Sequence, residues 1–157
     1  MSIKKIKPSK DSGYIQGYFK PSNPEKYVGP APIIYRSSWE RKFMIYCDTR
    51  PEVVSWSSEP VEIKYWFSMD NKAHTYHPDF YMKVLANGKT TEYLVEIKPE
   101  SHLTKPLPPT KHSKKALENY KYIAEQYVKN RDKYVAAKAW AENRGWQFIV
   151  LTEKSLK

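Results

Sequence analysis

One dipeptide, Asn87-Gly88, limits the folds open to this chain more than any other feature of its sequence. Asn-Gly is the strongest short-range indication of a two-residue β-hairpin, because both residues accept the positive φ angles that such a turn needs. Strand-like runs lie on either side of it, over residues 74–84 and 91–98. The sequence therefore predicts an antiparallel hairpin whose strands lead away from this turn.

The remaining pattern predicts a mixed α/β domain. A helix is expected from Ser37 or Ser38, which can cap it, to Thr49-Arg50, because Pro51 disfavours helical geometry at the residue before it. We expect the order helix, mostly antiparallel strand meander, basic helix with one candidate break near Asn130, and final buried strand. Two more strands are expected over residues 53–56 and 61–67, with a turn at 70–71 after the second. The proline-rich break is expected over 99–109, the basic helix over 110–144 and the final strand over 146–151.

Residues 1–32 differ in composition from the rest of the chain. They hold five prolines and six lysines and show almost no aliphatic periodicity. Proline fixes φ and removes a hydrogen-bond donor, so this segment is predicted to be an extended N-terminal arm that lies along the domain or along a partner. The division expected is a basic, proline-rich arm over 1–32 and one domain over 33–157.

Net charge indicates a polyanionic partner. The chain has 27 Lys and Arg against 17 Asp and Glu, a formal charge of +10, which attracts nucleic acid through counterion release. The sequence shows no basic segment with a clean apolar face, no secretion signal and no apolar run long enough to span a bilayer. We therefore expect a soluble protein without a membrane partner. Cys47 is the single cysteine; it excludes an intramolecular disulfide and fits a reducing compartment.

The hairpin brings together three residues that suit phosphodiester hydrolysis. Asp79 lies nine residues before Gly88 and Glu96 eight after it, so in-register pairing sets them nearly opposite one another. Glu96 and Lys98 share one face, because strand side chains alternate. Two carboxylates suit Mg²⁺, which lowers the pKa of bound water, and an ammonium stabilises developing negative charge. We favour that electrostatic role for Lys98 over general base catalysis, which would need a strongly lowered pKa.

Simpler explanations compete at several positions. A Glu-x-Lys on an edge strand is usually a solvated surface pair, and Pro-Asp is common in turns. Here Pro78-Asp79 falls inside a strand-like run, an unusual place for a structural proline unless an edge or a site needs it. His77 would share a face with Asp79 and is a candidate neighbour of the metal, or else packs within the strand. His74 would face the opposite way, which argues against a zinc pair.

A longer series of segments resembles the PD-(D/E)xK nucleases, and within them the TnsA-like branch. The resemblance implies a restriction-endonuclease-like core, with Asp79 and Glu96 as ligands of Mg²⁺ (Mn²⁺ can substitute), Lys98 as the catalytic lysine, and Glu40 as an acid and metal ligand from the first helix. Without the family pattern, Glu40 would be no more than an acid at a helix N-terminus. TnsA itself has glutamine where this chain has Glu96. The segments that carry the resemblance are Tyr35–Glu40, Pro51–Trp56, Glu59-Pro60, Ile63–Tyr65, His77–Phe80 and Glu96–Lys98.

DNA contact is predicted to run through the phosphate backbone. Residues 111–144 hold nine Lys or Arg against four Asp or Glu, and no base-reading module is visible. A basic helix face of this kind is equally often exposed to solvent without contacting DNA. The candidate DNA-binding residues are Arg36, Lys111, Lys114, Lys115 and Lys121.

The length and the basic arm resemble those of the head completion nucleases of T-even-like phages. This resemblance implies a nuclease that trims packaged DNA in the host cytoplasm or on the virion, next to portal or neck proteins. Two alternatives stay open. One is a structural head or neck protein that grips DNA with a nuclease fold, and the other is a TnsA-like or restriction-type subunit that cuts only with a partner.

Overall fold

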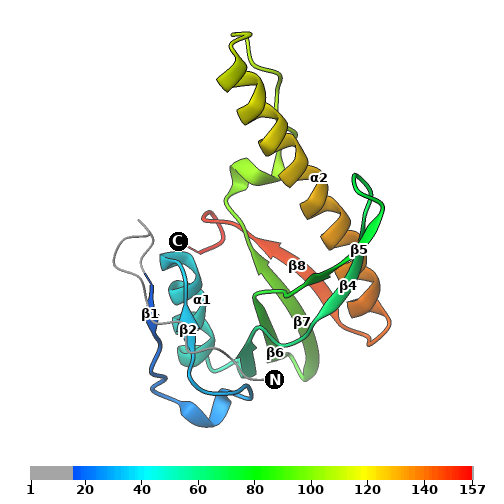
Figure 1. Ribbon diagram of the computed structural model, residues 1–157. Helices are drawn as coiled ribbons and strands as arrows, with labels where there is room; N and C mark the ends of the chain where they lie inside the picture. The colour runs from blue at the N-terminus through cyan, green and yellow to red at the C-terminus, as the bar shows by residue number, and fades with distance from the viewer. Residues whose placement is uncertain (1–15, 157) are drawn as a thin grey trace.

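The computed structural model describes residues 16–156, and its centre is a mixed four-stranded sheet in the order β3-β6-β7-β8. Helix α1 and a second helix, α2, lie against this sheet, and the projecting hairpin β4–β5 forms a separate two-stranded ribbon (Figure 1). A third, short pair of strands, β1 and β2, precedes α1. The elements are β1 Gly17–Tyr18, η1 Pro24–Lys26, β2 Ile34–Tyr35, α1 Ser38–Thr49, β3 Val53–Ser58, β4 Ile63–Phe67, β5 Lys72–Tyr76, β6 Phe80–Ala86, β7 Lys89–Ile97, η2 Glu100–Leu103, α2 Lys114–Glu142 and β8 Gln147–Leu151.

The predicted Asn87-Gly88 hairpin joins β6 to β7. Asn87 and Gly88 have φ angles of 53° and 73°, the positive values that a tight hairpin turn requires. Pairing is antiparallel and continuous from Ala86 opposite Lys89 down to Phe80 opposite Val95. The mixed four-stranded sheet with α1 and α2 packed against it has the α/β, restriction-endonuclease-like arrangement expected from the sequence.

The strand predicted over 74–84 is wrong, because it is two strands. β5 ends at Tyr76 and pairs with β4, whereas β6 begins at Phe80 and pairs with β3 and β7. Pro78 lies between them and is fully buried. Its missing N–H removes a ladder hydrogen bond and the chain changes sheets there, so the order is not a simple meander.

Two apolar clusters cover the two faces of the main sheet. The first lies between α1 and the sheet and includes Phe43, Trp56 and Phe80. The second lies between α2, β4–β5 and the sheet and includes Tyr76 and Leu94. Successive residues of β7 alternate between these faces, as expected for a strand that is covered on both sides.

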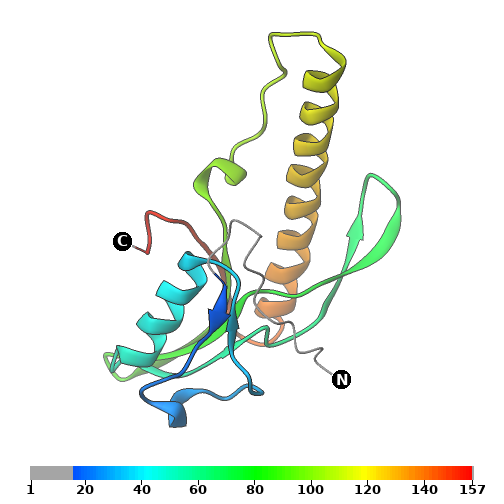
Figure 2. The same cartoon turned by 60° about the vertical axis from the view of Figure 1, so that its left-hand side comes forward.

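Both predicted helices are present, with two differences in the second. Ser37 caps α1, since its Oγ accepts a hydrogen bond from the Glu40 N–H at 3.1 Å. The second helix begins at Lys114, capped by Ser113, four residues after the expected start, and it continues through Asn130 without a break. Its amino-terminal half projects from the body of the domain (Figures 1 and 2). None of the helices within residues 16–156 is both long and apolar enough to cross a membrane.

The last strand, β8, is present but is half-buried where burial was expected. It pairs in parallel with β7, and residues 148–151 are all of intermediate exposure. As an edge strand it has a neighbour on one side only, which explains the partial burial. Gly145, with a φ of 73°, precedes it and follows the end of α2 as predicted.

Residues 16–32 of the predicted arm lie against the domain, and residues 1–15 lie outside the described part of the chain. Asp48 at the end of α1 accepts hydrogen bonds from the backbone N–H groups of Ser22 and Asn23, each at 2.9 Å. The ring of Tyr27 packs edge-on against Trp56 at 4.7 Å between centroids. A buried carboxylate therefore attaches this segment to the first core.

Removing that carboxylate tests how much the attachment contributes to stability. We expect Asp48→Ala to lower the free energy of unfolding by about 3 kcal/mol, because two N–H groups lose a charged acceptor. Urea denaturation measures the change, with Glu25→Ala, an exposed acid in the same region, as the control. A loss no larger than that of the control would contradict the assignment.

Candidate active site

The register of the β6–β7 hairpin sets Asp79 and Glu96 side by side at one end of the sheet. Phe80 pairs with Val95 at the end of the ladder, and Asp79 and Glu96 are the residues just beyond that last pair. The Asp79 Oδ2 accepts a hydrogen bond from the Ile97 N–H at 2.8 Å, and its backbone carbonyl accepts one from the Glu59 N–H at 2.8 Å. Asp79 is thus fixed by backbone groups on both sides, and the predicted approach of the two acids is confirmed.

Glu96 is a buried acid with two partners. Its side chain is 5% exposed; Oε2 accepts a hydrogen bond from the Tyr76 hydroxyl, and Oε1 lies 3.5 Å from the Lys98 Nζ. The contact confirms that Glu96 and Lys98 share one face of β7, since Ile97 between them packs into the cluster on the other face. The backbone N–H of Lys98 donates to the Leu151 carbonyl at 3.0 Å, so β8 holds the strand end in place.

Burial and mutual repulsion make this carboxylate pair costly to ionise. The pKa of Asp79 is raised well above its ordinary value, chiefly by burial and then by the charge of Glu96. The pKa of Glu96 is raised by burial, although Lys98 and the Tyr76 hydroxyl oppose the rise. Two adjacent acids with raised pKa values are the arrangement that a bound cation would relieve.

Glu40 approaches the same pair from the first turn of α1. Its Oε2 accepts a hydrogen bond from the Arg36 N–H at 2.6 Å, which fixes the chain that leads into the helix. Its charge also contributes to the raised pKa of Asp79, and burial followed by the charges of Glu59 and Glu96 raises its own pKa against the opposing effect of Arg36. Glu40 therefore contributes to the electrostatics of the pair. Within residues 16–156 it does not form a three-acid metal-binding group with Asp79 and Glu96, as expected of a metal ligand, and its catalytic role stays a prediction.

Sequence reasoning missed two residues that shape this site. Tyr76 holds Glu96, and Lys133 reaches in from α2, with its Nζ 5.4 Å from the centre of the Tyr76 ring. Burial and the nearby charge of Lys98 lower the pKa of Lys133. In the sequence Tyr76 is one aromatic residue of a strand and Lys133 is one lysine of a basic helix. No local pattern distinguishes them, because only the packing of α2 brings Lys133 here.

The candidate histidines fall outside the carboxylate cluster. His77 is exposed in the link between β5 and β6, so the alternation that gave it a shared face with Asp79 does not apply there. His74 packs on the Tyr65 ring and pairs with Asp70 at 2.7 Å in the β4–β5 ribbon. Its neighbours give it a structural role.

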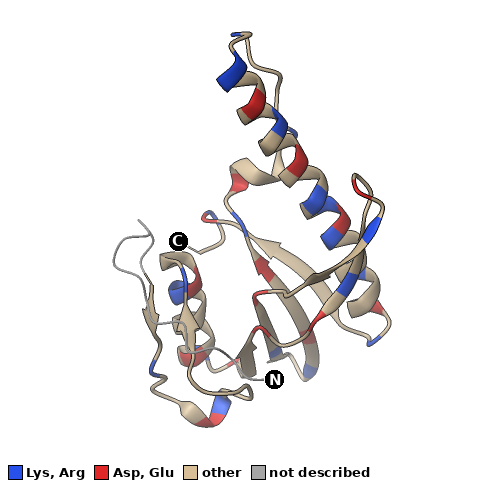
Figure 3. Cartoon of the chain, viewed as in Figure 1, with Lys and Arg blue, Asp and Glu red and all other residues tan. Residues whose placement is uncertain are grey.

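The predicted DNA-binding residues lie in two places. Arg36, before α1, is half exposed and forms an ion pair with Glu59. The four lysines are all exposed, before or within the projecting half of α2, where acidic residues lie between the basic ones (Figure 3). These lysines are Lys111, Lys114, Lys115 and Lys121.

The donor set of the site fits a hard divalent cation. Asp79 and Glu96 offer carboxylate oxygens, and Mg²⁺ usually takes one or two carboxylates together with water and substrate phosphate. Within residues 16–156 no three His, Cys, Asp or Glu side chains form a ready-made metal cage. A cation held by the two acids, with water and phosphate completing its coordination shell, therefore fits these residues better than a cation enclosed by protein ligands alone.

Replacing Asp79 by its neutral isostere tests the electrostatic strain. The pKa of Asp79 is higher in the folded protein than in the unfolded chain. Above about pH 4 the folded protein therefore keeps a proton that the unfolded chain has released, and its stability falls as the pH rises through this window. We expect Asp79→Asn, which keeps an acceptor for the Ile97 N–H, to raise the free energy of unfolding by about 1–2 kcal/mol at neutral pH in EDTA.

Urea denaturation across the acid-to-neutral range measures this effect. The gain should shrink at acid pH, where the wild-type carboxyl is protonated. Glu118→Gln, at an exposed position of α2, is the control and should show no such pH dependence. A destabilised Asp79→Asn at neutral pH would mean that the carboxylate is not strained.

Comparison with known proteins agrees with this geometry. Residues 50–153 match the family model described as TnsA-like endonuclease N terminal, a range that includes Asp79, Glu96 and Lys98 but not Glu40. The chain is also 34% identical over 142 residues to the head completion nuclease of Enterobacteria phage T4, which covers 90% of this chain and 93% of that protein. No solved structure matched the chain. Two thirds of the chain, including the carboxylate pair, thus follow one family pattern, and the chain belongs to the TnsA-like endonuclease family.

Proposed function

We propose that this protein is a metal-dependent DNA endonuclease in which Asp79 and Glu96 hold Mg²⁺, or Mn²⁺ in its place. The observation that carries the proposal is the strained carboxylate pair with Lys98 Nζ 3.5 Å from Glu96. The pair lies on the stretch that matches the endonuclease family. The pair consists of the buried Glu96 and the half-buried Asp79, and its raised pKa values mean that ionising both acids destabilises the free protein. A bound cation would offset that cost, which is why such strain is typical of functional sites.

Each residue of the site has a role that its contacts support. A bound divalent ion would supply Lewis acidity toward a phosphodiester and would lower the pKa of a coordinated water. Lys98, held beside Glu96, is placed to stabilise negative charge as it develops on the phosphate oxygens. Tyr76 and the Ile97 N–H orient the two carboxylates, and the charge of Glu40 adds to the repulsion that raises the pKa of Asp79.

We further propose that the protein acts on packaged DNA during phage head completion, in the infected host cell or on the virion. The support is the similarity over most of both chains to a protein named head completion nuclease. Portal or neck proteins are the expected protein partners. A structural head protein that only grips DNA would have no need of the strained acid pair, and for that reason we favour the enzyme.

The metal-dependent mechanism is tested at Asp79. We expect Asp79→Ala to reduce DNA cleavage by about a thousandfold or more, equivalent to about 4 kcal/mol of activation free energy, because a metal ligand is lost. DNA affinity, measured by fluorescence anisotropy, should change little, since the basic surface persists. Asp70→Ala in the exposed β4–β5 turn is the control. Full activity in EDTA, or undiminished cleavage by Asp79→Ala, would refute the mechanism.

Backbone contact by α2 is tested with the double variant Lys114→Gln, Lys115→Gln. Adjacent helix residues diverge by about 100°, so at least one of the two should meet a phosphate if this end of α2 contacts DNA. We expect weaker binding to every sequence alike and a shallower salt dependence, by about one unit of log–log slope for each lysine in contact. Lys89→Gln, at the opposite end of the β6–β7 hairpin from the site, is the control. An unchanged slope would assign this end of α2 to solvent or to a protein partner.

A further inference from the structure

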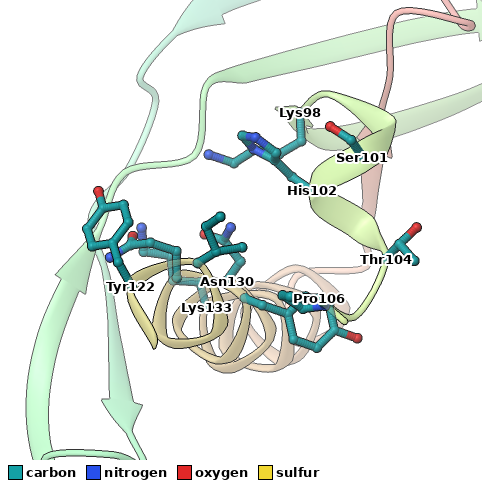
Figure 4. Close-up of a pocket in the computed structure, with 11 residues that line it drawn as sticks. Lys98, Ser101, His102, Thr104, Pro106, Tyr122, Asn130 and Lys133 are labelled. Atoms are coloured by element: carbon teal, nitrogen blue, oxygen red, sulfur yellow. The ribbon is translucent and has the colours of Figure 1, made fainter. Parts of the chain in front are cut away.

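A cavity of about 340 Å³ opens beside the carboxylate pair, between α2 and the segment that follows β7. Lys98 and His102 line it from the β7 and η2 side, and Tyr122, Asn130 and Lys133 line it from the helix (Figure 4). These three helix residues are eight and three residues apart, close to whole numbers of helical turns, so they lie along one face of α2. The cavity therefore lies between α2 and the chain that continues from the proposed catalytic residue Lys98.

The end of the cavity nearest the acids is cationic. Lys98 Nζ lies 3.5 Å from Glu96, and Lys133 Nζ lies 5.4 Å from the centre of the Tyr76 ring, whose hydroxyl donates to the same Glu96. Two ammonium groups thus converge where the cavity meets the site. Such a pair suits a phosphate group that lies between the site and the cavity.

The rest of the lining suits a nucleobase. It offers the flat rings of Tyr122, Tyr127 and His102, on which a base can stack, and the amides of Gln126 and Asn130, which can bond its edge. Tyr122 is 62% exposed, and His102 is exposed as well, so both rings are available to a ligand. A lining of rings and amides behind two cations matches the chemistry of a nucleotide.

The size of the cavity selects a single, unpaired nucleotide. A volume of about 340 Å³ is at the lower end of small-ligand sites, which begin at roughly 300 Å³. A base inside a duplex is stacked on two neighbours and joined to a partner, so it cannot enter such a space without being extruded. A base in a single-stranded end or junction enters without that cost.

We propose that this cavity binds one unpaired nucleotide of the DNA strand, next to the phosphate that the Asp79–Glu96 site would hydrolyse. The preferred substrate is then DNA with a single-stranded extension or junction, in preference to continuous duplex. This inference rests on the proposed endonuclease function, and the test is arranged so that the two can fail separately.

Binding in EDTA separates recognition from cleavage. We expect the wild-type protein to bind a hairpin-capped duplex with a short thymidine extension about tenfold more tightly than the blunt version of the same duplex. The double variant Tyr122→Ala, His102→Ala should lose that preference while its affinity for the blunt duplex stays the same. Both side chains are exposed, so the fold should persist, and circular dichroism checks this. Tyr18→Ala, which removes an exposed tyrosine from β1, is the matched control and should keep the preference.

The outcomes distinguish the two proposals. Equal wild-type affinity for both duplexes, or an equal loss on both in the double variant, overturns the nucleotide site even if the protein cleaves DNA with Mg²⁺. A tenfold preference that depends on Tyr122 and His102 supports the nucleotide site even if neither Mg²⁺ nor Mn²⁺ elicits cleavage, a result that would overturn the nuclease mechanism instead.

Discussion

The rest of this structure depends on the register of one hairpin, in which β6 and β7 pair around Asn87-Gly88. That register places Asp79 next to Glu96, sends Glu96 and Lys98 to the α2 face, and turns Ile97 into the opposite core. A slip of one residue would exchange the faces of one strand, so that one of the two acids would face α1 and the pair would be separated. The turn resists such a slip because its two residues adopt positive φ angles that few other dipeptides tolerate.

Placing two acids together in a half-closed site is unfavourable, and the surrounding residues offset that cost in different ways. The Ile97 N–H and the Tyr76 hydroxyl each donate to one carboxylate, while Lys98 supplies a positive charge beside Glu96. Lys133 adds a second positive charge from α2, and its own pKa is lowered by burial and by Lys98. Because these partners leave both acids with raised pKa values, the cost is only partly offset. A divalent cation is the natural counter-charge for what remains.

Local sequence patterns predicted the parts of this site that lie within one hairpin or one helix turn. Asn87-Gly88 sets the pairing of Asp79 with Glu96, alternation sets Lys98, and Ser37 with Pro51 bounds the helix that carries Glu40. The errors arose where distant segments meet. Pro78 separates two strands that looked continuous, because β5 pairs with β4 and not with the main sheet. Lys133 entered the site through the packing of α2 on β4, and Tyr76 through its hydrogen bond to Glu96 on another strand; no local spacing encodes either contact.

The long helix α2 connects the carboxylate site with the proposed nucleotide cavity. Its carboxyl-terminal half is packed into the second core through Ala137 and Ala141, which fixes Lys133 relative to Glu96. Its middle turns carry Tyr122 and Asn130 over the cavity that begins at Lys98. Because one rigid helix holds both sets of residues, a nucleotide bound in the cavity would be set at a fixed distance from the acids. Positioning of this kind is what a phosphodiester needs for hydrolysis, since most of the work at such a centre is alignment and charge stabilisation.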